Sequence, residues 1–82
     1  MKKYIFFYFI SATADAVKQS APNHARYWAG KLLSGGPFAD FSGGFITFEA
    51  HSFEEATIIT NEDPFVKSNI LGKSQLKEWL AK

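Results

Sequence analysis

The amino-acid sequence predicts a single α+β domain, residues 1–82, whose elements follow the order strand, helix, strand, strand, helix, strand. Two strand-helix-strand units in this order, joined by right-handed crossovers, form a ferredoxin-like sandwich with a four-stranded antiparallel sheet. A length of 82 residues is sufficient for one domain and too short for two. The composition is 46% apolar and 17% aromatic, which supplies a core for a domain that would be marginally stable alone.

A first strand is expected over Tyr4–Ile10, where every residue is apolar or aromatic. Successive side chains of a strand point to opposite faces, so this run is apolar on both and is typical of a central, covered strand. The run also resembles the apolar part of a secretion signal. It is short for such a signal and rich in Phe and Tyr, which favours the strand, and it is too short to span a membrane.

A helix and an edge strand are expected next. The helix should begin at Pro22, because proline suits the first helical position, and should weaken at Gly30. The strand is expected over residues 33–39, with Ser34 as an alternative start. Pro37 places this strand at the edge of the sheet, since proline cannot donate a hydrogen bond to a neighbouring strand.

The second half of the chain contains a clear helix start. Ser52 and Glu55 have the spacing of a capping box, in which each side chain accepts a hydrogen bond from a free backbone N–H. The helix that they open should end near Asn61. The other elements expected in this half are a turn over residues 40–44, a strand over Gly44–Ala50, a helical turn from Asp63-Pro64 and a last strand over Gln75–Leu80.

This topology brings distant polar residues to one end of the sheet. The first strand ends where the helix carrying His24 begins, and the second strand ends at Asp40 on the same side. The second helix returns the chain to that end at Asp63. Both helices cover one face of the sheet, so the aromatic side chains of the other face need a second copy or a ligand to cover them. We expect a homodimer joined through its sheet faces.

Several short motifs occur together, in order, over nearly the whole chain: His24-Ala25-Arg26-Tyr27-Trp28, Gly35-Gly36-Pro37-Phe38-Ala39-Asp40, Gly43-Gly44, Phe48-Glu49-Ala50, Ser52-Phe53-Glu54-Glu55-Ala56 and Asn61-Glu62-Asp63-Pro64-Phe65. In this combination the chain resembles the YciI-like, or YCII-related, family. The resemblance implies a dimeric α+β barrel, in which two ferredoxin-like sheets face each other, and an active-site pair formed by His24 and Asp40. It also implies that the relatives include muconolactone-isomerase-like enzymes and that one branch of the family is linked to loss of HCl from chlorinated hydroquinones.

The topology and the resemblance single out His24 as a general acid or base, because imidazole exchanges protons near neutral pH. Asp40 would orient the ring and balance its charge; the alternative is a chance pairing of a surface His with an Asp of a turn. Asp63 is interpreted as the N-cap of the helical turn that Pro64 begins. The expected substrate-binding residues are Gly36, Pro37, Phe38, Phe65 and Trp28.

Charge and composition favour some functional classes over others. The formal net charge is +1 without a basic block, so neither nucleic acid nor a membrane is expected as a partner. The RNA-recognition motif has the same element order, but Phe41 stands where its signature requires a basic residue. No metal and no cofactor is expected, because cysteine is absent and the two histidines, His24 and His51, belong to opposite ends. A chain without cysteine also fits the reducing cytoplasm.

The expected function is acid/base proton transfer by the His–Asp pair on a small aromatic or lactone-like substrate. The reaction would be of the isomerase or the lyase/dehydrohalogenase type. The alternative is a non-catalytic dimer that binds a small metabolite. A substitution of His24 that changes turnover would indicate the enzyme, and one that changes only affinity would indicate the binding protein.

Overall fold

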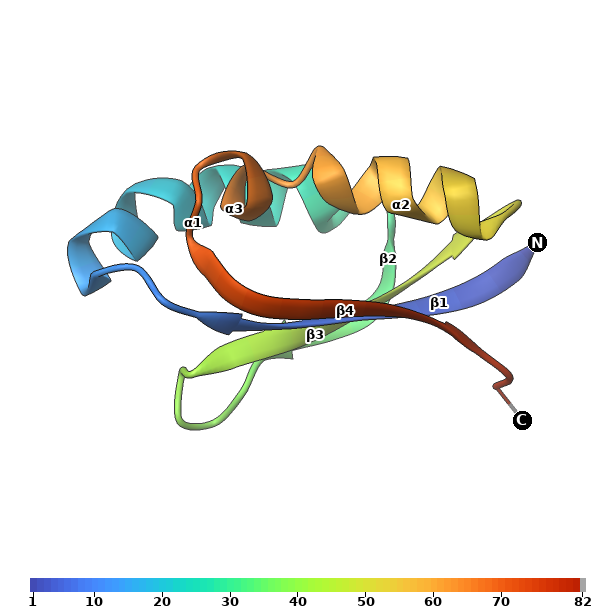
Figure 1. Ribbon diagram of the computed structural model, residues 1–82, viewed down its shortest axis with the longest axis horizontal. Coiled ribbons are helices and arrows are strands. Elements are labelled where there is room, and N and C mark those ends of the chain that lie inside the picture. The colour runs from blue at the N-terminus through green and yellow to red at the C-terminus, as the bar shows by residue number, and fades with distance from the viewer. Residues whose placement is uncertain (82) are drawn as a thin grey trace.

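The computed structural model describes residues 1–81, and its elements follow the order expected from the sequence. Their bounds are β1 (Lys2–Ile10), α1 (Ala14–Ala29), β2 (Leu32–Pro37), β3 (Gly43–Ala50), α2 (Phe53–Asn61), α3 (Pro64–Lys67) and β4 (Leu71–Trp79). The strands form one antiparallel sheet in the order β2-β3-β1-β4. All three helices lie on one side of this sheet (Figure 1). The fold is the ferredoxin-like α+β sandwich that the element order predicts.

Strand β1 is central, because it pairs with β3 along one edge and with β4 along the other. Its alternate side chains Tyr4, Phe6 and Tyr8 are buried beneath the helices. Phe48 and Ile46 of β3 lie directly opposite the first two of these and are buried as well. Each large side chain that is removed from water in this layer contributes about 1.5–3 kcal/mol to folding. The core therefore lies between the sheet and the helices.

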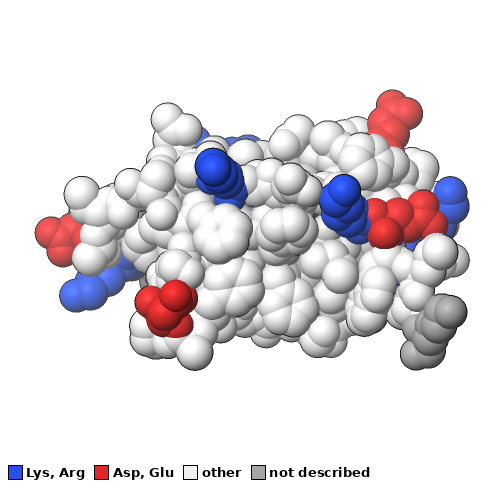
Figure 2. Space-filling view, turned by 60° about the horizontal axis from the view of Figure 1, so that its bottom comes forward, with Lys and Arg blue, Asp and Glu red and all other residues white. Residues whose placement is uncertain are grey.

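The other face of the sheet is aromatic and partly exposed. Phe9 and Phe45 are 44% and 40% exposed, and Phe7 lies opposite Phe45 in the strand register. Figure 2 turns this side toward the viewer and shows a broad uncharged area between separated charged groups. Phe48 of β3 lies on the opposite, helix-covered face, because its position differs from that of Phe45 by an odd number.

Helix α1 begins earlier than the sequence predicted. It starts at Ala14 and not at Pro22, which lies inside the helix. The Thr13 hydroxyl caps the first turn by accepting a hydrogen bond from the Ala16 N–H at 3.2 Å. The segment before the proline contains no glycine and several alanines, so the helix extends although proline lacks an N–H to donate. His24 consequently lies well inside a 16-residue helix.

The cap of helix α2 is confirmed. The Glu55 N–H donates to the Ser52 Oγ at 3.1 Å, as the capping box requires. The Glu55 carboxylate in turn accepts from the backbone N–H of His51 at 2.9 Å, one residue before the position that the motif usually uses. Two backbone donors at the start of the helix are thereby satisfied, and both contacts are local in sequence.

Several strand bounds differ from the prediction, and two of these differences have a clear structural cause. Strand β2 ends at Pro37 and not at Ala39, because the next residue closes the hairpin turn by donating its N–H to the Gly43 carbonyl at 2.8 Å. Strand β4 begins at Leu71 and not at Gln75, because its backbone continues to pair with β1 as far as a bulge at Phe9/Ile10. Pairing with a formed neighbour outweighs the weak strand preference of the residues themselves.

Candidate functional site

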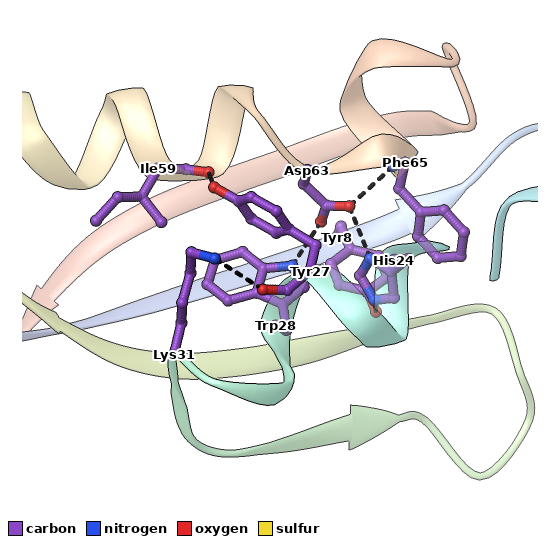
Figure 3. A network of polar contacts seen from close by, with 8 residues as sticks. All are labelled: Tyr8, His24, Tyr27, Trp28, Lys31, Ile59, Asp63 and Phe65. Carbon is purple, nitrogen blue, oxygen red and sulfur yellow. Dashed lines mark hydrogen bonds and ion pairs between the residues drawn. The ribbon is translucent and has the colours of Figure 1, made fainter. Parts of the chain in front are cut away.

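His24 and Asp63 form a hydrogen-bonded pair on the helix side of the sheet. The His24 Nδ1 lies 2.7 Å from the Asp63 Oδ1 (Figure 3). The side chain of Asp63 is fully buried, and that of His24 is 14% exposed. Helix α1 carries the histidine, and the turn before α3 carries the aspartate. Two segments that are 39 residues apart therefore meet through their side chains.

The carboxylate of Asp63 accepts two further hydrogen bonds. The indole Nε1–H of Trp28 donates to Oδ2 at 2.9 Å, and the backbone N–H of Phe65 donates to Oδ1 at 2.8 Å. The latter bond is the N-cap of α3, which the Asp63-Pro64 dipeptide predicted. Three donors from α1 and α3 therefore surround one buried carboxylate, which satisfies its lone pairs and compensates for its removal from water.

The imidazole of His24 is held between two aromatic rings. Phe65 stacks on it with the ring centroids 3.9 Å apart and the planes 10° from parallel. Tyr8 meets it edge-on at 5.8 Å, and the Tyr8 Oη lies 3.3 Å from the His24 Nε2 (Figure 3). Packing on both sides restricts rotation of the ring and keeps Nδ1 directed at Asp63.

The hydrogen bonds define where the proton of neutral His24 resides. An ionised carboxylate only accepts hydrogen bonds, so the Nδ1 that contacts Asp63 carries the hydrogen. The Nε2 atom then has the free lone pair, which accepts the hydrogen of the Tyr8 hydroxyl. Nε2 is the basic atom of the site, and it points away from Asp63.

A cavity of about 440 Å³ lies beside this histidine, between α1 and the sheet. Four of the expected substrate-binding residues line it, namely Gly36, Pro37, Phe65 and Trp28. Phe38 is absent from the lining residues that the structure describes, and its ring packs against Phe9 at 5.8 Å instead. No charged side chain occurs among the described residues of the lining, so the cavity suits a small, mostly apolar molecule.

Asp40 does not meet His24, which corrects the pairing expected from the sequence. Its carboxylate is exposed and accepts hydrogen bonds from the Ser42 Oγ at 2.6 Å and the Ser42 N–H at 3.0 Å. These bonds from the side chain and backbone of Ser42 lower the pKa of Asp40 below its ordinary value. The reason for the difference is the early start of α1, which carries His24 inward over the sheet and toward Asp63, while Asp40 stays in the hairpin turn.

Tyr8 is the site residue that the sequence reasoning missed. It lies in the apolar run of β1, and the sequence pattern there indicates only a strand position. Burial, followed by the negative charge of Asp63, raises the pKa of Tyr8 to about 12. The sequence offered little signal, because Tyr4 lies on the same helix-facing side of β1 and its buried hydroxyl has no hydrogen-bond partner.

The described residues offer no metal site and no membrane-spanning helix. Within residues 1–81 no three His, Cys, Asp or Glu side chains lie close enough to share a metal ion. None of the helices in that range has both the length and the apolarity needed to cross a membrane.

Fold and site together define a class, a ferredoxin-like α+β domain with a buried histidine–carboxylate pair beside an apolar cavity. The YCII-related domain matches residues 1–80, so the chain belongs to the YCII-related family. This confirms the resemblance carried by the sequence motifs.

Individual relatives extend the comparison. The chain is 49% identical over 54 residues to the uncharacterized protein YjpA of Bacillus subtilis (strain 168), a match that covers 63% of this chain and only 60% of YjpA. Among solved structures, it is similar to the 5-chloro-2-hydroxyhydroquinone dehydrochlorinase TftG of Burkholderia phenoliruptrix AC1100, in complex with 2,5-dihydroxybenzoquinone. The TM-score is 0.82 at 20% identity, over 94% of this chain and 92% of TftG.

A second similar structure belongs to another functional class. It is the transcriptional regulator NMB0573 of Neisseria meningitidis in complex with L-Met, with a TM-score of 0.69 and 12% identity. The match covers 99% of this chain but 51% of the regulator. At such identities both structures show the fold alone, and the function has to be argued from the site of this chain.

Proposed function

We propose that the protein is an enzyme that moves protons on a small, flat substrate with His24 as general base and Asp63 as its partner. The observation that carries this proposal is the 2.7 Å contact between a fully buried carboxylate and a histidine that lines an apolar cavity. Burying a charged carboxylate costs free energy unless hydrogen bonds or an opposite charge compensate for it. Such a buried pair therefore indicates either a structural or a chemical role. The basic Nε2, which lies beside the Tyr8 hydroxyl at the cavity, favours the chemical role.

The chemistry follows from the roles of the atoms. Nε2 of His24 accepts a proton from the substrate, and the carboxylate of Asp63 balances the positive charge that forms on the ring. Isomerisation follows if the proton returns at another position, and elimination follows if a leaving group departs. Of these two reactions, elimination is supported by the fold that the chain shares with the TftG dehydrochlorinase.

The proposal includes a homodimer that is joined through the free faces of the two sheets. The support for it is the exposed aromatic side chains on that face, which monomers rarely leave in contact with water. In this arrangement the cavity remains on the helix side of each sheet, and each copy keeps its own His24. A cytoplasmic location, suggested by the composition, belongs to the same proposal.

The two histidines of the chain provide a matched test. 5-Chloro-2-hydroxyhydroquinone is the first substrate to try, with chloride release as the assay. We expect His24→Gln to lower kcat about 10²–10⁴-fold, and we expect His51→Gln, at an exposed position, to leave it unchanged. Circular dichroism would verify that both variants fold.

Two results would count against the enzyme. If His24→Gln releases chloride at the wild-type rate, the histidine is not the base. If the wild type binds chlorinated hydroquinones and related lactones without converting any of them, the binding-protein alternative replaces the enzyme. A smaller effect of Asp63→Asn than of Asp40→Asn would reinstate Asp40 as the functional carboxylate.

A further inference from the structure

The hydroxyl of Tyr8 occupies a position between His24 and the cavity. Its side chain comes from the C-terminal part of the central strand β1 and is only 4% exposed. The hydroxyl oxygen lies 3.3 Å from the His24 Nε2, and both residues line the cavity. The basic nitrogen of the site is therefore already in contact with a hydroxyl of the protein itself.

A glycine on the neighbouring strand lets the Tyr8 hydroxyl reach its position beside the cavity. Gly44 lies directly opposite Tyr8 on strand β3. A Cβ atom at residue 44 would come within 2.8 Å of the Tyr8 hydroxyl, so glycine is needed there for the ring to reach its position. With its hydrogen directed at Nε2, the Tyr8 oxygen keeps lone pairs that can accept a hydrogen bond from a bound molecule.

The lining of the cavity restricts what this molecule can be. Among the described lining residues, none is Lys, Arg, Asp or Glu. Trp28 also lines the cavity, but its indole N–H donates to Asp63. Tyr8 and His24 are thus the side chains with polar atoms available to a ligand in the described lining, and they suit a hydroxyl group better than a carboxylate or a phosphate.

We propose that Tyr8 is a catalytic residue that touches the substrate and passes its proton to His24, and that the substrate is an uncharged ring bearing an acidic hydroxyl. The inference rests on the proposed acid/base function and specifies its path. The O–H bond of the substrate breaks as a new O–H bond forms at Tyr8. The former Tyr8 O–H bond breaks as an N–H bond forms at Nε2. The electron pair stays on the substrate oxygen, and Asp63 balances the imidazolium.

The raised pKa of Tyr8 agrees with this path. At neutral pH a tyrosine whose pKa is about 12 is protonated both before and after the transfer. It does not retain the negative charge, which remains on the substrate. After the transfer, the Tyr8 hydroxyl donates a hydrogen bond to the substrate oxyanion and stabilises it.

The probe for this proposal is 4-nitrophenol, because its phenolate absorbs visible light and its phenol form does not. Binding is measured at a pH about one unit below the pKa of the free probe. We expect the wild type to bind the probe and to produce the phenolate spectrum. Tyr8→Phe should bind the probe within about 3-fold of the wild-type Kd, but its phenolate signal should fall at least about 10-fold.

Tyr27→Phe is the matched control. This variant also removes a hydrogen-bonded tyrosine hydroxyl, because Tyr27 of α1 donates to the Ile59 carbonyl at 2.5 Å. Tyr27 is not among the described residues that line the cavity. It should give the wild-type spectrum.

Should Tyr8→Phe fail to fold, 3-fluorotyrosine at position 8 keeps the hydroxyl and makes it more acidic. The bound probe should then ionise at lower pH, and an unchanged midpoint would overturn the relay.

The outcomes separate this inference from the function on which it rests. Full phenolate signal in Tyr8→Phe together with its loss in His24→Gln would overturn the relay and leave His24 as a direct base. If the wild type binds only the neutral phenol, both the Tyr8 relay and the proposed acid/base function are overturned. A wild type that does not bind the probe would overturn the hydroxyl-bearing ring as the substrate class, whereas chloride release that depends on His24 would still support the acid/base function.

Discussion

The side chain of Asp63 joins helix α1 to the start of α3. It accepts hydrogen bonds from His24, Trp28 and the backbone of Phe65, and it has no exposed surface. Asp40, in contrast, bonds only to Ser42 within its own turn among the described contacts. The two aspartates have the same side-chain chemistry, and their neighbours give them different structural roles.

Asparagine at each position measures this difference. In Asp63→Asn one acceptor oxygen becomes an amide that donates, so a buried donor loses its partner. We expect a loss of about 1–3 kcal/mol in the free energy of unfolding, measured by urea denaturation. Asp40→Asn should leave the urea midpoint close to that of the wild type, because asparagine also forms the turn. Equal midpoints for the two variants would contradict the assignment of Asp63 as the buried partner.

At the scale of elements, close approach of β1 and β3 positions Tyr8. Gly43 and Gly44 begin β3 and pair with Phe9 and Tyr8 of β1. The ideal Cβ position at Gly43 lies 1.8 Å from the Tyr8 carbonyl oxygen, a distance that no side chain can occupy. In the preceding turn Phe41 adopts a φ of 60°, which is costly for an aromatic residue, and its side chain lines the cavity. The geometry of this hairpin therefore affects the site directly.

A single methyl group tests this requirement. Gly43→Ala should displace β3 from β1 and lower the free energy of unfolding by more than about 3 kcal/mol, because backbone must move. Gly30→Ala, at the end of α1, is the control, since a Cβ there meets no atom within 4 Å. Thermal unfolding followed by circular dichroism compares the two. Similar melting temperatures of the Gly43→Ala and Gly30→Ala variants would show that β3 can move away from β1 at Gly43 without a loss of stability.

For the whole molecule, the free face of the sheet is the main unexplained surface. The helices cover one side only, and Phe9 and Phe45 on the other side are 44% and 40% exposed (Figures 1 and 2). A domain of 82 residues has a small core, so covering this face would add appreciably to its stability. A second copy supplies a face of the same shape and chemistry, as a two-fold interface requires.

A charge at this face should separate the copies. We expect the wild type to sediment at twice the monomer mass of 9.2 kDa. Phe45→Glu should weaken association by about 100-fold or more, because the carboxylate would be buried without a partner. Ile58→Glu alters an equally apolar and 58% exposed position on α2, and this variant should remain a dimer. A wild type that sediments as a monomer at micromolar concentration would exclude the dimer.

The sequence alone was sufficient where the information is local. The apolar run of β1, the edge position that Pro37 imposes on β2 and the cap at Ser52 all depend on residues within a few positions of one another. The order of these elements then determined the ferredoxin-like topology, because crossovers are right-handed and neighbouring strands pair. The same reasoning placed His24 and Asp63 at one end of the sheet and identified the N-cap at Asp63.

Only the tertiary structure decided which side chains meet. A shift of the start of α1 from Pro22 to Ala14 changes nothing in the order of the elements, yet it takes His24 to Asp63 and away from Asp40. The contact of Tyr8 with His24 joins residues 16 positions apart through the packing of a helix on a strand. The topology determines the end of the sheet at which residues lie, with a precision of several ångströms. A hydrogen bond is more demanding, because its donor and acceptor atoms must be about 3 Å apart. That final placement depends on how the helices pack, and helix packing is determined by the whole core.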